Sequence, residues 1–76
     1  MPHVTVEHFP ADLTDEQKRR LAAELTEIIV WRFGTYPGAV SIALEPVAPE
    51  DWRSQVYEPR IVGRADRLIK APEYRA

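Results

Sequence analysis

A helix with a marked start stands between two strand-like segments, and this order limits the fold more than any other pattern in the sequence. Thr14-Asp15-Glu16-Gln17 is a capping box, in which the Thr hydroxyl accepts a hydrogen bond from the third helical amide and Gln17 reaches back. Gly34 suits a C-terminal cap. Between them an apolar stripe recurs at helical spacing, formed by Leu21, Leu25, Ile28, Ile29 and Arg32 or Phe33. We therefore predict one amphipathic helix here.

Both flanking segments alternate as half-buried strands do. From Pro2 to His8, one face carries Val4, Val6 and His8, and from Ala39 to Pro46, one face carries Val40, Ile42 and Leu44. Strand, capped helix and strand within about 45 residues form a βαβ unit, which predicts parallel strands and a right-handed crossover.

A loop rich in proline and acidic residues follows, and a second helix is expected to begin around Pro59, since proline is favoured at the first helical position. Its weaker apolar stripe consists of Ile61, Ala65, Leu68 and Ile69, and Pro72 ends it. The fold class expected is α+β, with an α/β-type βαβ unit and a C-terminal helix. No repeat or linker interrupts residues 1–76, which we interpret as a single domain.

The chain is too short to be very stable alone. Its 76 residues would bury only about 60% of the unfolded surface, and one core of that size rarely supplies more than ~3–5 kcal/mol. With 0 cysteines it has neither disulfides nor thiolate metal sites. A two-stranded sheet also leaves two open edges. Both arguments predict a homo-oligomer.

Composition excludes several classes of partner. The net charge of −2 lacks the basic footprint of a nucleic-acid-binding protein, and no apolar run approaches the ~18 residues of a membrane span. No export signal follows Met1, so we expect a cytoplasmic protein. His3 and His8 have opposite strand parity, so they cannot chelate one metal ion from one strand.

Pro2 is the residue whose chemistry changes most with processing. If Met1 is removed, Pro2 becomes a secondary amine at the start of a strand. A free α-amine has a pKa of about 7.7–8.0. An apolar pocket lowers that pKa because it disfavours the charged form of the amine. Pro2 would then be a neutral general base near neutral pH.

Several segments together resemble the tautomerase superfamily, and in particular small 4-oxalocrotonate-tautomerase-like enzymes of the phenylpyruvate type. The matching segments are Met1-Pro2-His3-Val4, Phe9-Pro10, Asp15-Glu16-Gln17-Lys18, Ser41-Ile42-Ala43-Leu44, Pro49-Glu50-Asp51-Trp52, Val56-Tyr57 and Leu68-Ile69-Lys70-Ala71-Pro72-Glu73-Tyr74. They cover nearly the whole chain. The resemblance implies a β-α-β fold, an oligomer whose sheets are joined between subunits, and cofactor-free keto–enol chemistry in which Pro2 shuttles the proton as general base and acid.

The resemblance also implies a substrate class. Trp52 stands where the family places an aromatic pocket residue, and we expect it to pack an aryl substrate. The 4-oxalocrotonate enzyme holds a dicarboxylate with two arginines, and here Leu13 and Ser41 occupy those positions. The phenylpyruvate-type relatives lack them too, which favours a hydrophobic 2-oxo acid with one carboxylate. Their longer C-terminal segment accompanies dimers, so a dimer is favoured here.

Some cation should still meet the substrate carboxylate. Arg60 is the first candidate and Arg53 the second, because Arg can bind a carboxylate through two hydrogen bonds. His3 is a third possible electrophile beside Pro2.

Two other classes of function stay open at this stage. A proline-dependent hydratase, dehalogenase or decarboxylase would need a further charged group, for which Glu7 and Glu45 are candidates. A non-catalytic binding or assembly protein of the same fold would retain Met1, so that Pro2 never becomes an amine.

Overall fold

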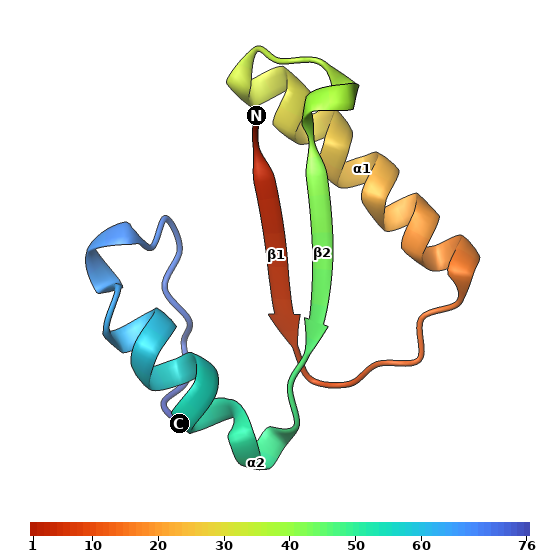
Figure 1. Ribbon diagram of the computed structural model, residues 1–76. Coiled ribbons are helices and arrows are strands. Elements are labelled where there is room, and N and C mark those ends of the chain that lie inside the picture. The colour runs from red at the N-terminus through yellow and green to blue at the C-terminus, as the bar shows by residue number, and fades with distance from the viewer. The chain divides into compact units, whose positions relative to one another are not determined.

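The computed structural model describes residues 1–76. Along the chain lie strand β1 (His3–His8), helix α1 (Asp15–Phe33), strand β2 (Ser41–Pro46) and helix α2 (Pro49–Trp52) (Figure 1). β1 and β2 are neighbours in one two-stranded sheet. This order confirms the predicted β-α-β fold with a C-terminal helix.

The two strands run in the same direction (Figure 1). At one end the backbone N–H of Ser41 donates to the carbonyl of Pro2 at 3.1 Å, and at the other the N–H of Val47 donates to the carbonyl of His8 at 2.8 Å. Both bonds join residues the same number of positions apart, as a parallel ladder requires. The predicted parallel pairing is confirmed.

Helix α1 begins and ends at the predicted residues. The Thr14 side chain accepts from the Gln17 backbone N–H at 3.1 Å, and the Gln17 side-chain carbonyl accepts from the Thr14 N–H at 2.8 Å. At the other end Gly34 has φ 63°, a left-handed conformation that glycine adopts without the Cβ penalty, and its N–H donates to the carbonyl of Val30.

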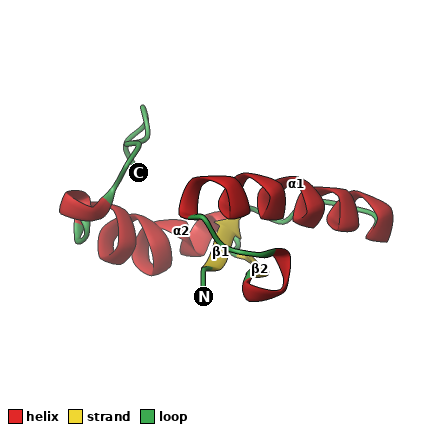
Figure 2. Cartoon of the chain, turned by 90° about the horizontal axis from the view of Figure 1, so that it is seen from above, coloured by secondary structure: helices red, strands yellow, loops and turns green.

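Helix α1 lies on one side of the sheet (Figure 2), and its half-buried positions are Leu21, Ala22, Leu25, Thr26, Ile29 and Val30. The predicted apolar stripe was therefore wrong in part, because Ile28 is 56% exposed and Phe33 is 71% exposed. Ile28 lies on the flank of the helix, and Phe33 is its last residue. No residue of α1 is fully buried, so this helix does not complete a core within the chain.

The chain divides into two compact units. The first comprises Met1–Val6 and Ala11–Glu45, and it holds α1 and most of both strands. The second comprises Glu7–Pro10 and Pro46–Ala76, and it holds the ends of the strands and the C-terminal helical segment. The assignment of the whole chain to a single domain stays a prediction.

The C-terminal helix begins earlier than predicted. It starts with α2 at Pro49, continues as a π-helix over Arg53–Val62, and is followed by one 3₁₀ turn over Ala65–Arg67. The expected start at Pro59 was wrong, because Pro49 occupies the favoured first position instead. Pro59 lies inside the helix, where its missing N–H and its clash with an earlier carbonyl oppose a regular α-helix.

Few residues are fully buried. They are Ala39 in the first unit, and Val47 and Val56 in the second. Ala39 ends a 3₁₀ turn that begins at Pro37, so β2 starts two residues later than the sequence suggests, at Ser41. None of the helices combines the length and the apolar composition needed to cross a membrane.

Candidate active site

Pro2 stands at the start of the sheet, in the first unit. It is half-buried, and its carbonyl accepts the first hydrogen bond from β2 through Ser41. Met1 before it is 93% exposed. While Met1 is attached, the Pro2 nitrogen is part of a peptide bond and can accept no proton. Removal of this exposed residue would convert it to a secondary amine without disturbing the hydrogen bond of the Pro2 carbonyl.

His3 points to the opposite face of the strand from Val4, and both of its ring nitrogens have partners. His3 Nδ1 shares a hydrogen bond of 2.7 Å with Ser41 Oγ, and His3 Nε2 shares one of 3.3 Å with Thr5 Oγ1. Ser41, which the resemblance matches to an arginine of the dicarboxylate enzyme, is therefore the partner of His3. A substrate oxygen would have to replace Ser41 or Thr5 to bind this imidazole.

Trp52 lies in the second unit among other aromatic rings. Its ring meets Phe9 edge to face, with centroids 5.1 Å apart and planes at 85°. Its indole Nε1–H donates to the Tyr74 hydroxyl at 2.9 Å, and Tyr74 in turn contacts Tyr57 with centroids 5.8 Å apart. The three aromatic rings of Phe9, Trp52 and Tyr74, which we call the aromatic cluster, come from three separate parts of the sequence.

An open pocket of about 550 Å³ adjoins the aromatic cluster. Its lining is Glu7, His8, Phe9, Trp52, Tyr74 and Ala76. This volume lies within the usual range for small-molecule sites of about 300–1,000 Å³. Aromatic side chains on its wall suit a flat apolar group, and Glu7 supplies its one acidic side chain. We call this space the Trp52 pocket.

Arg60 reaches the edge of the Trp52 pocket through Glu7. Arg60 Nε lies 2.9 Å from Glu7 Oε2, with the Arg60 side chain 57% exposed and that of Glu7 23% exposed. Arg53 is engaged elsewhere, at 2.9 Å from Glu58 Oε1. Of the two predicted arginines, Arg60 is therefore the one paired with a residue that lines the pocket. A substrate carboxylate would compete with Glu7 for the Arg60 guanidinium.

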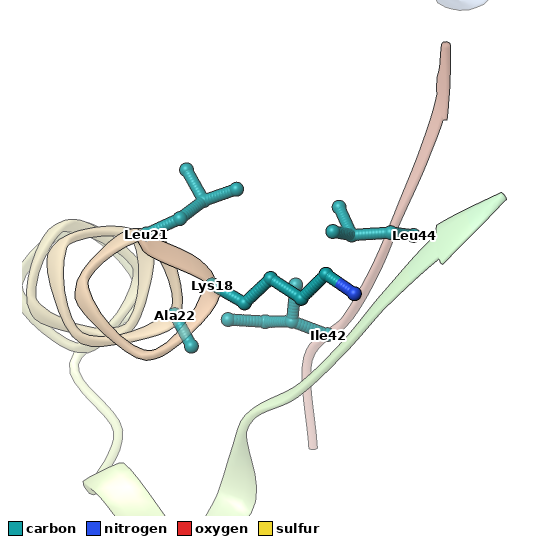
Figure 3. A pocket seen from close by; sticks show the side chains of 5 residues that line it. All are labelled: Lys18, Leu21, Ala22, Ile42 and Leu44. Atoms are coloured by element: carbon teal, nitrogen blue, oxygen red, sulfur yellow. The ribbon is translucent and has the colours of Figure 1, made fainter. Parts of the chain in front are cut away.

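A second pocket, of about 300 Å³, lies within the first unit between α1 and β2. Lys18 extends from α1 toward β2, where Ile42 and Leu44 line the pocket, and Leu21 and Ala22 line its helix side (Figure 3). Apart from the Lys18 ammonium group, the lining offers no side chain that could transfer a proton. Elsewhere, no group of three or more His, Cys, Asp or Glu side chains is placed to hold a metal ion.

The structure thus brings two of the four predicted site residues to one place. Trp52 and Arg60 belong to the second unit, where Trp52 lines the Trp52 pocket and Arg60 pairs with the lining residue Glu7, whereas Pro2 and His3 belong to the first unit. That Pro2 and the Trp52 pocket act together stays a prediction. Sequence reasoning missed Phe9 and Tyr74 as pocket residues, because no local pattern shows which aromatic side chains pack against Trp52.

Comparison with known proteins identifies the family. The family model described as "Tautomerase enzyme" matches residues 2–57. Proteins named "Tautomerase PptA" are similar along 97% of both chains, with 47% identity in Enterobacter sp. (strain 638), 43% in Cronobacter sakazakii and 38% in Pectobacterium atrosepticum. The chain therefore belongs to the tautomerase family and is an isomerase of the keto–enol type.

Proposed function

We propose that this tautomerase interconverts the enol and keto forms of an aryl 2-oxo acid, with the Pro2 amine as general base and acid after removal of Met1. The neutral amine takes the proton of the enol hydroxyl, and the carbonyl double bond forms as the carbon–carbon double bond breaks. The carbon atom next to the new carbonyl group then takes a proton from the Pro2 ammonium group. The amine returns to its starting state, and no cofactor is consumed.

The aromatic lining of the Trp52 pocket is the observation that carries the choice of substrate. Phe9, Trp52 and Tyr74 offer ring faces and edges to a phenyl group, and aromatic pairs of this kind contribute roughly 0.5–1.5 kcal/mol beyond the area that they bury. None of the residues that line the pocket is Lys or Arg. A single carboxylate that competes with Glu7 for Arg60 suits this site better than a dicarboxylate.

The position of Pro2 supports its role as the proton carrier. Its half-buried ring stands at the beginning of β1, where partial dehydration disfavours the charged form of an amine. The backbone hydrogen bond to Ser41 fixes this end of the strand, so the nitrogen has little freedom once Met1 has left. General base catalysis requires such a fixed, neutral group within reach of the substrate proton.

Ketonisation of phenylenolpyruvate tests the proposal directly. Intact-mass measurement first establishes that Met1 is absent, and the rate is then compared among the wild-type protein, Pro2→Ala and Pro10→Ala. Pro2→Ala should lose most of its activity, with a remainder from its primary amine, whereas Pro10 is an exposed loop residue and its variant should keep the wild-type rate. An unprocessed protein with Met1 in place should be inactive.

Undiminished ketonisation by Pro2→Ala would contradict the proposed mechanism, and so would the absence of any acceleration over buffer by the processed wild type. A halopyruvate, which alkylates neutral amines, gives an independent measurement at pH 7–8. It should label the processed N-terminus and leave the unprocessed protein unlabelled at Pro2.

Glu7 bears on the alternative of a proline-dependent hydratase, dehalogenase or decarboxylase. Such a reaction would require Glu7 or Glu45 to activate water or to supply charge. Glu7 is already paired with Arg60, so it would have to leave that ion pair to activate water, and Glu45 lies exposed at the end of β2. These observations favour the tautomerase reaction, and we place it in the cytoplasm, as expected from the sequence.

We propose further that the protein is a homodimer. Both strands of the sheet have one unpaired edge, and α1 contributes no buried residue. On the flank of α1 an apolar groove of about 630 Å³ is lined by Ala23, Thr26, Glu27, Val30, Trp31 and Pro37. Trp31 is 70% exposed there. In a dimer related by a two-fold axis, Trp31 of each subunit could lie beside the small Ala23 of the other. This arrangement would cover the grooves and the Trp31 rings of both subunits.

Sedimentation of Trp31→Lys tests this interface. The lysine would stand four residues after Glu27 on α1, a spacing that favours the helix, so the variant should stay folded. We expect it to sediment as a monomer where the wild type is a dimer. Ile69→Lys is the matched control, because Ile69 is fully exposed and lies outside the groove. A dimeric Trp31→Lys protein would exclude the groove as the interface.

A further inference from the structure

Tyr74 is held in place although the segment around it has no helix or strand. After the 3₁₀ turn Ala65–Arg67 the chain has no further regular element. Even so, the Tyr74 hydroxyl accepts a hydrogen bond from Trp52 at 2.9 Å, and its ring contacts Tyr57 at 5.8 Å. Two contacts of different kinds therefore fix this side chain, and with it the end of the chain.

The bond between Trp52 and Tyr74 has a definite chemical direction. An indole nitrogen can only donate, so the Tyr74 oxygen must be the acceptor. Phe9 contacts the same indole edge to face, so two interactions hold the Trp52 ring: the hydrogen bond of its N–H and the aromatic contact with Phe9. Loss of the Tyr74 hydroxyl would leave the N–H to water and would remove one of these two restraints.

Tyr74 also forms part of the pocket wall, with Trp52, Phe9 and Glu7. It is 42% exposed, so it borders the pocket at the surface rather than within a core. A ring in that position offers a flat apolar wall to a group that lies against Trp52. A branched alkyl group of similar volume offers neither a ring face nor a ring edge to these two side chains.

We infer that the C-terminal segment is part of the substrate pocket and that Tyr74 determines its preference for aryl over alkyl 2-oxo acids. This inference rests on the proposed function, because it assigns the Trp52 pocket to the substrate side chain. Tyr74 acts in two ways: its ring forms one wall, and its hydroxyl orients the indole of Trp52.

Binding of two 2-oxo acids that cannot enolise tests the inference apart from catalysis. Phenylglyoxylate is the aryl probe and trimethylpyruvate the alkyl probe, and neither carries a hydrogen on the carbon next to its carbonyl. The chain has two tryptophans, so the Trp31→Phe background leaves Trp52 as the single tryptophan, which is excited selectively at wavelengths that tyrosine does not absorb. Quenching of its emission gives the Kd of each probe, and the ratio of the two Kd values measures aryl preference.

Three variants in this background separate the two roles of Tyr74. Tyr74→Ala should reduce the aryl preference by about 2- to 12-fold, the range that one aromatic pair supports. Tyr74→Phe keeps the ring, so it should keep most of the preference but shift the emission of Trp52 as the indole N–H turns to water. Tyr36→Ala, which removes an exposed tyrosine of the first unit, should change neither quantity.

An unchanged Kd ratio in Tyr74→Ala would overturn the inference, and so would an equal loss of affinity for both probes. Circular dichroism establishes whether Tyr74→Ala is folded. If it is not folded, Tyr74→Phe provides the test, because an unshifted Trp52 emission in that variant would overturn the orienting role of the Tyr74 hydroxyl. Because neither probe reacts, these outcomes are independent of Pro2. If Pro2 proves not to be the proton carrier while the aryl preference is intact, the proposed mechanism is refuted but the assignment of the Trp52 pocket to the substrate side chain is not.

Discussion

Replacement of Glu7 by Gln should release Arg60 for the substrate carboxylate. The pair is close, at 2.9 Å, but the Arg60 side chain is 57% exposed, so solvent screens most of the Coulomb energy. Pairs with this degree of exposure are worth about 0.2–1 kcal/mol. Glu7→Gln should therefore lower the free energy of unfolding by that amount, which corresponds to a fall in Tm of up to about 8 °C.

The same free energy sets the expected change in KM. If Arg60 binds the substrate carboxylate as we propose, that carboxylate must displace Glu7 in the wild type, whereas in Glu7→Gln the guanidinium is free. Removal of a competitor worth about 0.2–1 kcal/mol strengthens binding about 1.4- to 5-fold. KM for phenylenolpyruvate should fall by this factor, and kcat should stay close to the wild-type value because Pro2 is untouched.

Glu45→Gln is the matched control for this experiment. It removes the same charge from an exposed position of β2 that makes no ion pair. Steady-state ketonisation kinetics and thermal melts are measured on both variants and on Arg60→Gln, whose KM should rise. The reasoning is refuted if Glu7→Gln is less stable yet has an unchanged or higher KM, because Arg60 would then bind only Glu7 and not the substrate.

Two further substitutions test the fold by thermal melts followed by circular dichroism. Thr14→Ala removes the side-chain half of the capping box and should cost about 1 kcal/mol, a fall in Tm of about 4–8 °C, whereas an unchanged Tm would mean that the cap contributes nothing. Gly63→Ala would place a Cβ 2.8 Å from the backbone oxygen of Pro59, so the π-helix must shift at a cost of about 1–3 kcal/mol; a fully stable variant would contradict this tight turn.

The fold of the first unit could be predicted because its signals are local. The capping box of Thr14 and the left-handed Gly34 lie within one turn of the helix ends that they define, and strand alternation needs only a few neighbouring residues. The C-terminal helix was misplaced because Pro49 and Pro59 carry the same start signal. Only the path of the chain decides that the first begins the helix and the second lies inside it.

The site was less predictable because its contacts join distant parts of the sequence. Trp52 was indicated by resemblance alone, and its partners Phe9 and Tyr74 approach it from the end of β1 and from the C-terminal segment. The hydrogen bond between His3 and Ser41 likewise depends on strand register, which alternation does not specify across a crossover. Side-chain identity could name these residues as candidates, but not their partners.

The positions of the charges give the proposed substrate class a structural reason. From the sequence, the absence of arginine at Leu13 and Ser41, taken with the resemblance, already favoured a hydrophobic 2-oxo acid with one carboxylate. In the structure, Ser41 binds His3, and Arg60 is balanced by Glu7 at the edge of an aromatic pocket. A second carboxylate would meet Glu7 with no basic side chain lining the pocket to offset the repulsion, whereas one carboxylate can exchange places with Glu7 on Arg60 without changing the net charge of that pair. For this reason the substrate that we propose for this pocket is a flat apolar acid with a single charge.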